Sequence, residues 1–358
     1  MFPYLAMLAV PACLTLSGVR RAGIVLLLVA AFYWLMVGFR FHVGMDWNNY
    51  IYIYDARKAE TFAQVLTARE PGYGFLSWVA ARSGLGVLFL NAASALVFCW
   101  GLFAVARRCP DPLLAIVVAT PLLVVAFAMS GTRQAIATGL IYYLFATWEK
   151  RQTASRVLMV ALASLFHFSA IFIGIFVALG VKAPVPVRVF GVVVVGLIFL
   201  VAVRMAPVSM DAYSRLYVGA QSKLSAPGAI AQVAPLALAG VIYLALRERW
   251  TALFGDDQLM RSLAWGALID LPVILISSVG AYRFGLYFWP LAMYVYSGLP
   301  SLSPSATGRA FLRLSFVVIS FALLIGWLMF ANNSWPWLPY ENWLLQPGGA
   351  GLLRPATR

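Results

Sequence analysis

Residues 157–180 read VLMVALASLFHFSAIFIGIFVALG, and this stretch decides how the chain crosses a membrane. It is almost entirely apolar except for His167 near its middle. The stretch is either one long crossing or two short half-helices that meet near His167. Non-helical backbone at membrane depth is tolerated only where it lines a cavity, so a break at His167 would mark one. A satisfied core histidine is the simpler alternative, but ionisable groups inside a membrane are costly and commonly functional.

The rest of the chain has the same apolar character. Of its 358 residues, 63% are hydrophobic and only 11% are charged, whereas soluble domains are near half apolar and a quarter charged. These values exclude a soluble enzyme, a disordered chain and a nucleic-acid-binding domain. We therefore predict an all-α polytopic membrane helix bundle of about 11–12 transmembrane helices, forming one domain over 1–358. The expected spans are 3–18, 22–41, 85–106, 112–129, 133–147, 157–180, 189–205, 229–246, 261–279, 284–299 and 310–331.

Charge predicts which loops face the cytoplasm. Lys and Arg number 26 against 12 Asp and Glu, and compact basic loops at 20–21, 107–108 and 150–156 favour the cytoplasmic side. The outer loop 42–84 then faces the opposite side. Its segment 72–83 is too short to span comfortably, so we expect it to lie at the membrane interface or to re-enter. A broken helix at 157–180 would place the later Arg residues and the aromatic C-terminal stretch on the side of this loop, and we favour that arrangement.

The outer loop carries two acids, and the sequence places few other acids on that side of the membrane. Asp46 lies in RFHVGMDWNNY (40–50), and Glu70 lies in REPGYGF (69–75). Either acid could accept a proton from a hydroxyl group. Structural explanations compete: the first motif could be an aromatic belt with Arg40 at a helix end, and Glu70 before a proline could simply favour a helix dipole.

Three further segments supply cations and tyrosines. In SGTRQAIA (130–137), a helix start beside Arg133 suits an anion such as diphosphate, although an interfacial Arg can also reach lipid headgroups. In YRFGLYFWPL (282–291), Arg283 precedes Tyr287 by one turn, and a substrate phosphate or an acid such as Asp46 would pair with it. In the segment 210–219, a local Asp–Arg ion pair is a sufficient structural explanation for Arg215, while Tyr213 suits stacking on sugars.

The sequence contains no phosphate-binding glycine loop and no zinc motif, and its three Cys are scattered. We therefore expect no metal, no cofactor, no disulfide framework and no nucleotide-sugar donor.

The ordered motifs RFHVGMDWNNY, REPGYGF, SGTRQAIA, LFHFSAI, YRFGLYFWPL and WLPYENW resemble the EpsG-like family of Wzy-type exopolysaccharide and O-antigen polymerases over about 30–350. The resemblance implies a fold like that of the C-type glycosyltransferases. It implies a substrate of oligosaccharide repeat units on undecaprenyl diphosphate, joined at the periplasmic face of the bacterial inner membrane without a nucleotide. A chain-length regulator and a flippase are the partners it implies. The chain lacks the long inserted periplasmic loop of some Wzy relatives, so Arg motifs from that loop do not carry over.

These inferences predict a division of roles. Asp46, then His167, then Glu70 are the expected catalytic bases for the acceptor hydroxyl. Arg133 and Arg283 are expected to bind the diphosphate, assisted by Arg215 or Arg40. The sugar-orienting residues are expected to be Tyr50, Tyr213 and Tyr287. Asp111 is expected at the surface. The alternatives are a lipid-linked oligosaccharide flippase without chemistry, an O-antigen ligase or a membrane acyltransferase.

Overall fold

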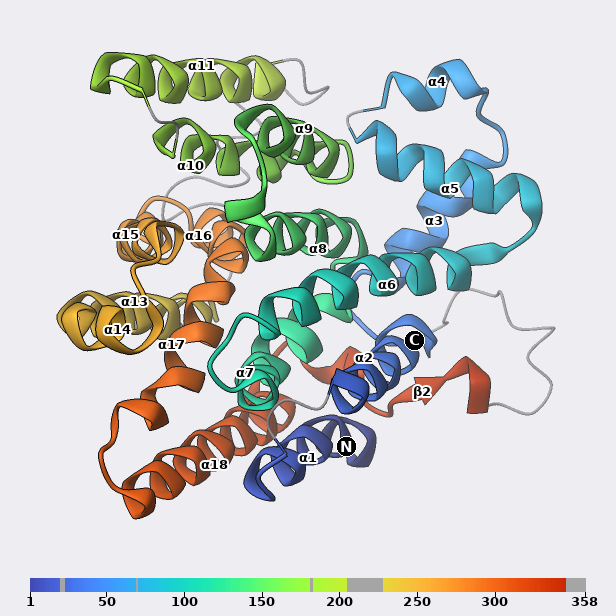
Figure 1. The fold of residues 1–358 in the computed structure, drawn as a ribbon. Helices are drawn as coiled ribbons and strands as arrows, with labels where there is room; N and C mark the ends of the chain where they lie inside the picture. Colours follow the sequence, from blue (N-terminus) through green and yellow to red (C-terminus); the bar gives the residue numbers. More distant parts are fainter. Residues whose placement is uncertain (20–22, 69, 181–182, 205–227, 346–358) are drawn as a thin grey trace.

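The computed structural model describes residues 1–19, 23–68, 70–180, 183–204 and 228–345. These residues form a bundle of helices, which confirms the predicted all-α polytopic class (Figure 1). Within the described ranges the α-helices are α1 (Phe2–Leu16), α2 (Gly23–Gly38), α3 (Trp47–Arg57), α4 (Phe62–Leu66), α5 (Pro71–Ser83), α6 (Gly86–Ala106), α7 (Pro112–Ala119), α8 (Thr132–Ala146), α9 (Thr153–Ser164), α10 (Ile173–Leu179), α11 (Val185–Arg204), α13 (Ala229–Ala245), α14 (Arg247–Phe254), α15 (Gln258–Val273), α16 (Ser278–Gly285), α17 (Trp289–Leu302) and α18 (Ala306–Phe330). A π-helix, η1 (Thr120–Ala128), continues α7, and the short 3₁₀-helices are η2 (Trp148–Lys150), η3 (Phe168–Phe172), η4 (Leu286–Phe288), η5 (Trp335–Trp337) and η6 (Trp343–Leu345).

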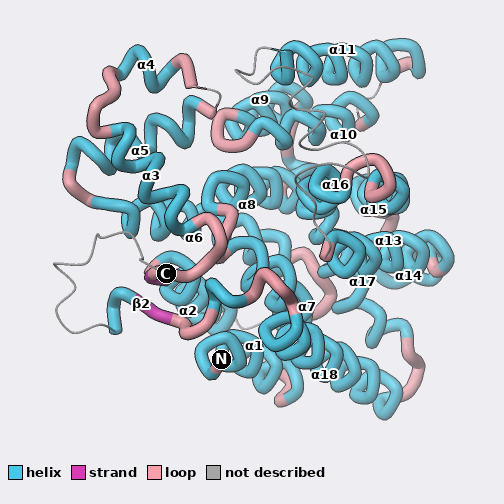
Figure 2. Tube along the Cα trace, turned by 180° about the vertical axis from the view of Figure 1, so that it is seen from behind, coloured by secondary structure: helices cyan, strands magenta, loops and turns pink. Residues whose placement is uncertain are grey.

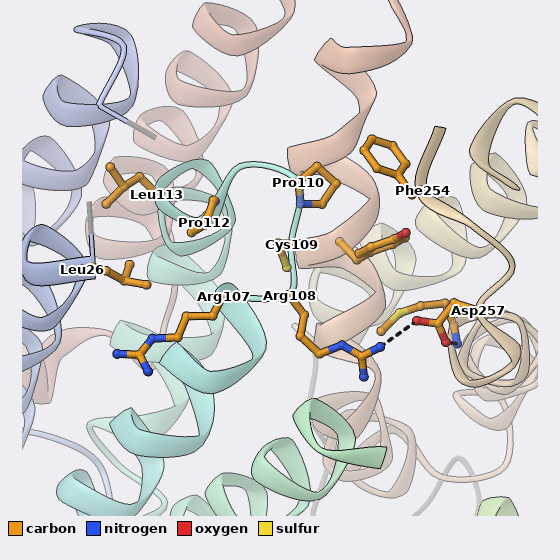
Figure 3. A pocket seen from close by; sticks show the side chains of 12 residues that line it. Leu26, Arg107, Arg108, Cys109, Pro110, Pro112, Leu113, Phe254 and Asp257 are labelled. Atoms are coloured by element: carbon orange, nitrogen blue, oxygen red, sulfur yellow. Dashed lines mark hydrogen bonds and ion pairs between the residues drawn. The ribbon is translucent and has the colours of Figure 1, made fainter. Parts of the chain in front are cut away.

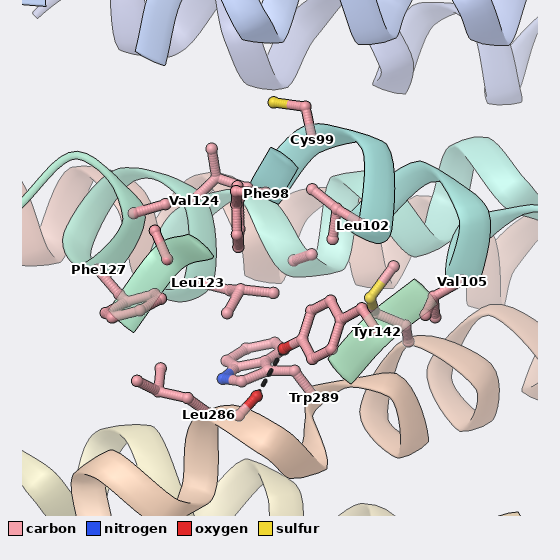
Figure 4. Packing of buried hydrophobic residues seen from close by; sticks show 14 of the residues in the cluster. Phe98, Cys99, Leu102, Val105, Leu123, Val124, Phe127, Tyr142, Leu286 and Trp289 are labelled. Atoms are coloured by element: carbon pink, nitrogen blue, oxygen red, sulfur yellow. Dashed lines mark hydrogen bonds between the residues drawn. The ribbon is translucent and has the colours of Figure 1, made fainter. Parts of the chain in front are cut away.

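The centre of the bundle is the packing of α6 against α8. A Cβ atom on Gly101 would overlap the carbonyl oxygen of Gly139, and one on Gly139 would overlap that of Val97. The two backbones therefore touch, which is how small residues let helices associate where lipid provides no hydrophobic driving force. Around this crossing, Phe98 of α6 packs with Tyr142 of α8, whose hydroxyl donates to the carbonyl of Leu286 at 2.5 Å (Figure 4).

The other helices surround this pair in groups. Helices α9, α10 and α11 lie together on one side of the bundle, and α1 and α18 pack together on the opposite side (Figure 2). Most of the predicted spans coincide with a described helix to within a few residues, because apolar runs bounded by basic or Pro- and Gly-containing turns define them well.

Two of the described helices are long and apolar enough to be complete spans, Gly86–Ala106 and Ala306–Phe330. A third span exists if α13 and α14, which meet at 79°, count as one. The remaining apolar helices of 10–17 residues are shorter than a full crossing of about 20 residues. The count of about 11–12 spans therefore stays a prediction.

The apolar stretch around His167 is interrupted. Helix α9 ends at Ser164, His167 is extended (φ −153°, ψ 120°), and η3 and α10 follow. The carbonyl of Leu165 accepts from the amide of Gly72 at 2.9 Å, so α5 satisfies backbone that the break leaves outside the helix. That the two arms are half-spans, and that α5 lies at the membrane interface, remain predictions.

The described C-terminal segment closes over the start of the outer loop. Strand β1 (Arg40–Phe41) pairs antiparallel with β2 (Glu341–Asn342), and the amide of Gly44 donates to Pro336 at 3.1 Å. Gly44 has φ +104°, and a Cβ there would overlap the carbonyl oxygen of Met129. Only glycine suits this position, which holds the loop against the end of η1.

Candidate functional site

Three segments that are far apart in sequence meet at the carboxylate of Glu70. Arg133 Nη1 at the start of α8 donates to Glu70 Oε2 at 2.7 Å, and His167 Nδ1 at the break lies 2.9 Å from Glu70 Oε1. The Glu70 side chain is only 8% exposed, whereas that of Arg133 is 40% exposed. The cluster is therefore a buried acid that holds one histidine and one accessible guanidinium.

Local sequence explains how Glu70 reaches this place. It is the residue before α5, whose first residue is Pro71, but its side chain makes no capping bond to the helix. The carboxylate bonds Arg133 and His167 instead, so the helix-dipole explanation accounts for its position and not for its contacts. Burial by itself would raise the pKa of Glu70, but the hydrogen bond and charge of His167 and the charge of Arg133 outweigh it and lower the pKa to about 2. Glu70 is therefore a fixed anion.

Asp46 lies beside the same turn of α8. Its backbone amide is 3.3 Å from the Ser130 hydroxyl, and that hydroxyl is 3.4 Å from Asp46 Oδ2. Burial raises the pKa of Asp46, while Arg133, the Ser130 hydroxyl and Arg283 oppose this rise. Asp46 is thus a partly buried acid near two cations, and its raised pKa makes its carboxylate a stronger base than that of an ordinary aspartate.

The turn at 130–132 begins α8, as expected from SGTRQAIA. Helix α8 starts at Thr132, and no side chain caps it. The Ser130 hydroxyl bonds Asp46, and the Thr132 hydroxyl bonds Asn91 and accepts from Arg40. These side chains therefore connect α8 to the outer loop and α6.

Two of the predicted residues are buried supports of α8. Arg40 is 2% exposed, and its Nη atoms donate to Val37 O at 2.6 Å, Thr132 Oγ1 at 3.0 Å and Asn91 Oδ1 at 3.3 Å. The Tyr50 hydroxyl accepts from the amide of Arg133 at 3.3 Å.

Arg283 and Tyr287 reach the site from α16 and η4. Gln134 Nε2 donates to the Arg283 carbonyl at 3.0 Å, and the Tyr287 hydroxyl lies 3.0 Å from the Ser169 hydroxyl just after the break. Arg283 is close enough to influence the pKa of Asp46. The structure thus gathers Asp46, Glu70, His167, Arg133 and Arg283 around one region. Arg215 and Tyr213 lie outside the described residues.

A small cavity of about 110 Å³ opens beside this cluster and is lined by Glu70, Tyr73 and Arg133, together with Ile53, Arg57, Ala68 and Gly74. The cavity therefore adjoins the Arg133–Glu70 ion pair. Among the residues that the structure describes, no group of three or more His, Cys, Asp or Glu could hold a metal ion.

A larger cavity of about 620 Å³ lies at the other end of the bundle, beside Arg107, Cys109 and the 3.2 Å ion pair of Arg108 with Asp257 (Figure 3). Helix α7 and η1 connect the two ends over roughly 25 Å. At this far end the prediction for Asp111 is wrong, because its carboxylate is buried. It caps α7, accepts from Thr15 and lies 3.4 Å from Arg313.

Sequence reasoning missed Asn91 and Gln134 as partners in the site. Each is a buried amide in an apolar helix, and buried amides require hydrogen-bond partners. An amide within an apolar run of the sequence was therefore a usable signal. Which partner each would find depends on how α6, α8 and α16 pack, and a linear pattern does not contain that.

Comparison with known proteins relates the chain to one family. No curated protein and no solved structure matches the chain. The model of the EpsG family matches residues 23–342, nearly all of the chain. This protein therefore belongs to the EpsG family, a Wzy-like family of polysaccharide polymerases.

Proposed function

We propose that this protein polymerises undecaprenyl-diphosphate-linked oligosaccharide repeat units at the periplasmic face of the bacterial inner membrane. The observation that carries the proposal is the Arg133–Glu70–His167 cluster beside Asp46, on a bundle of a polysaccharide-polymerase family. A hydroxyl at the non-reducing end of a new unit attacks the anomeric carbon of the growing chain. The bond from that carbon to the lipid diphosphate breaks, and the diphosphate leaves with the electron pair.

Arg133 and Arg283 stabilise the negative charge that develops on the leaving diphosphate. Arg133 is suited to this role because Glu70 fixes one of its Nη atoms while the side chain stays 40% exposed. Preorganised cations in a partly dry site are typically worth about 10²–10³ in rate. Arg40 has little access to a ligand, so we propose that it supports α8 through Thr132.

Asp46 takes the proton from the acceptor hydroxyl. Its raised pKa and its position beside the cations suit a base better than Glu70, whose pKa is near 2. We propose that Glu70 positions Arg133 and His167. A proton on His167 Nδ1, facing Glu70, leaves Nε2 as an acceptor, which makes His167 the second base to test. Tyr50 and Tyr287 orient the substrate through the segments they hold.

The orientation follows from charge. The site lies at the end of the bundle opposite the basic 107–108 loop, and such loops favour the cytoplasm. We propose as partners a flippase that delivers the lipid-linked unit and a chain-length regulator.

The decisive experiment uses purified protein in nanodiscs with a native lipid-diphosphate-linked repeat unit, without nucleotide and with EDTA. A ladder of integral multiples of the unit supports the polymerase. Transfer of the glycan to a different acceptor, without a ladder, would favour the ligase. Movement of the unit across a vesicle membrane with no new glycosidic bond would favour the flippase.

A further inference from the structure

A second pocket, of about 120 Å³, lies where the outer loop meets the described C-terminal segment. Its walls include His42, Trp47 and Asn48 from the loop, and Trp335 and Glu341 from the other segment. The bond from the Gly44 amide to Pro336 and the β1–β2 pair fix the two walls relative to each other. The pocket is therefore built by tertiary structure and not by one flexible loop.

Two ring nitrogens on the loop wall are buried without a hydrogen-bond partner among the residues that the structure describes. They are Trp47 Nε1, in a residue that is only 6% exposed, and His42 Nε2. Buried polar groups that lack hydrogen-bond partners are uncommon in native structures, and they destabilise the fold unless a ligand or water molecule supplies the missing partner.

The backbone at the same place is strained. His42 has φ +54°, which is uncommon for a residue with a side chain, and its Nδ1 lies 3.4 Å from Glu341 Oε2. Strained backbone tends to persist at ligand-binding sites. The His42 ring lies in the wall beside both Trp47, at 5.5 Å between ring centroids, and Glu341.

The chemistry of the walls selects the ligand. Trp335 is 63% exposed and presents an indole face, while Asn48 is exposed and offers an amide beside it. Sugars combine an apolar ring face with hydroxyls that donate and accept, so flat indoles beside amide, imidazole and carboxylate groups complement them. A lipid tail could not form hydrogen bonds with these polar groups.

We infer that this pocket is a saccharide-binding subsite that holds one sugar ring of the oligosaccharide next to Asp46. The inference rests on the proposed polymerase function for the identity of its saccharide. Trp47 directly follows Asp46 in the chain, so a ring in this pocket places neighbouring hydroxyls near the proposed base. The subsite takes no part in the chemical step; it positions the glycan.

The test measures binding and needs no polymerisation. The probe is the repeat-unit oligosaccharide freed from its lipid diphosphate by mild acid, titrated against the full chain in nanodiscs and followed by saturation-transfer NMR. Trp335→Ala should weaken binding about tenfold through loss of the indole face. Trp47→Phe, which keeps a ring and removes the Nε1 donor, should weaken it less. Trp265→Ala is the matched control, because Trp265 is also exposed (56%) and lies outside the pocket.

The outcomes separate the two proposals. Equal affinity in wild type, Trp335→Ala and Trp265→Ala overturns the subsite. No binding by wild-type protein that still makes a ladder also overturns it and leaves the polymerase standing. Binding that depends on Trp335 in protein that makes no ladder supports the subsite and refutes the polymerase.

Discussion

Replacing Glu70 with Gln removes one negative charge from between Arg133 and His167 and leaves the shape of the side chain unchanged. The contacts of Glu70 lower its pKa from 4.5 to about 2, and each pKa unit corresponds to about 1.4 kcal/mol. The charge therefore contributes about 3 kcal/mol to the free energy of unfolding at neutral pH. In the Glu70→Gln variant the new amide group would also donate to His167 when it faces Nδ1, which forces the imidazole proton to Nε2 and removes that nitrogen as a base.

The pH dependence has a definite sign. Because the folded pKa of Glu70 is depressed, its stabilisation is complete above the ordinary value of 4.5 and is lost as pH falls through about 2. The stability difference between wild type and Glu70→Gln should therefore be constant from neutral pH to about pH 5 and shrink below that.

The assay is thermal unfolding in nanodiscs at several pH values, together with the rate of ladder formation. Glu248→Gln is the control, because Glu248 is exposed on α14 and its charge should contribute little. At neutral pH, Glu70→Gln should lower the Tm by several degrees and slow polymerisation, whereas the control should do neither. The reasoning is refuted if the two variants have equal Tm at neutral pH, or if the gap between Glu70→Gln and wild type widens as pH falls.

Three further predictions concern the proposed roles and the central packing. Arg133→Ala should lower the polymerisation rate about 10²–10³-fold. Arg133→Lys should recover only part of that rate, since an ammonium lacks the planar fork that bonds Glu70 with one nitrogen and presents the others to a phosphate. Full activity of Arg133→Ala in the gel assay would argue against the diphosphate role. Asp46→Asn should slow the reaction about 10²–10⁴-fold while binding of the lipid-linked unit persists. The control Asp55→Asn changes an exposed acid and should behave as wild type. Similar rates for the two variants would exclude Asp46 as the base. Gly139→Leu should abolish stable folding, because the new Cβ would overlap the backbone of α6. A size-exclusion profile and thermal unfolding that match wild type would show that α6 and α8 are not packed this closely.

The apolar runs by themselves determined much of the fold class. Excess apolar surface requires lipid as solvent, and turns with charge, Pro or Gly separate the runs, so helix positions such as 86–106 and 306–330 follow closely from sequence. The family resemblance was also readable, because the motifs occur in order along the chain, and the family match over residues 23–342 confirms it. Helix lengths were less readable from sequence: α9 ends at Ser164, where the amide of Gly72 in α5 donates to the carbonyl of Leu165 that follows.

Sequence also proposed the chemically capable residues, since charged groups in an apolar chain are few. It did not determine their partners. Glu70 was open to explanation as a helix-dipole acid, and only the packing of α5 on the break showed that its carboxylate bonds Arg133 and His167. Arg40 was expected to assist Arg133 in binding the diphosphate, yet Val37, Asn91 and Thr132 enclose Arg40, whereas the Arg133 side chain is 40% exposed.

The difference has one physical reason. Partition into lipid depends on the summed hydrophobicity of a local run, so a linear sequence specifies it. Hydrogen bonds, ion pairs and desolvation depend on distances of a few ångströms between segments far apart in the chain, and only the packed bundle sets those distances. The sequence therefore determined which groups this protein has available, and the tertiary structure decided which of them meet.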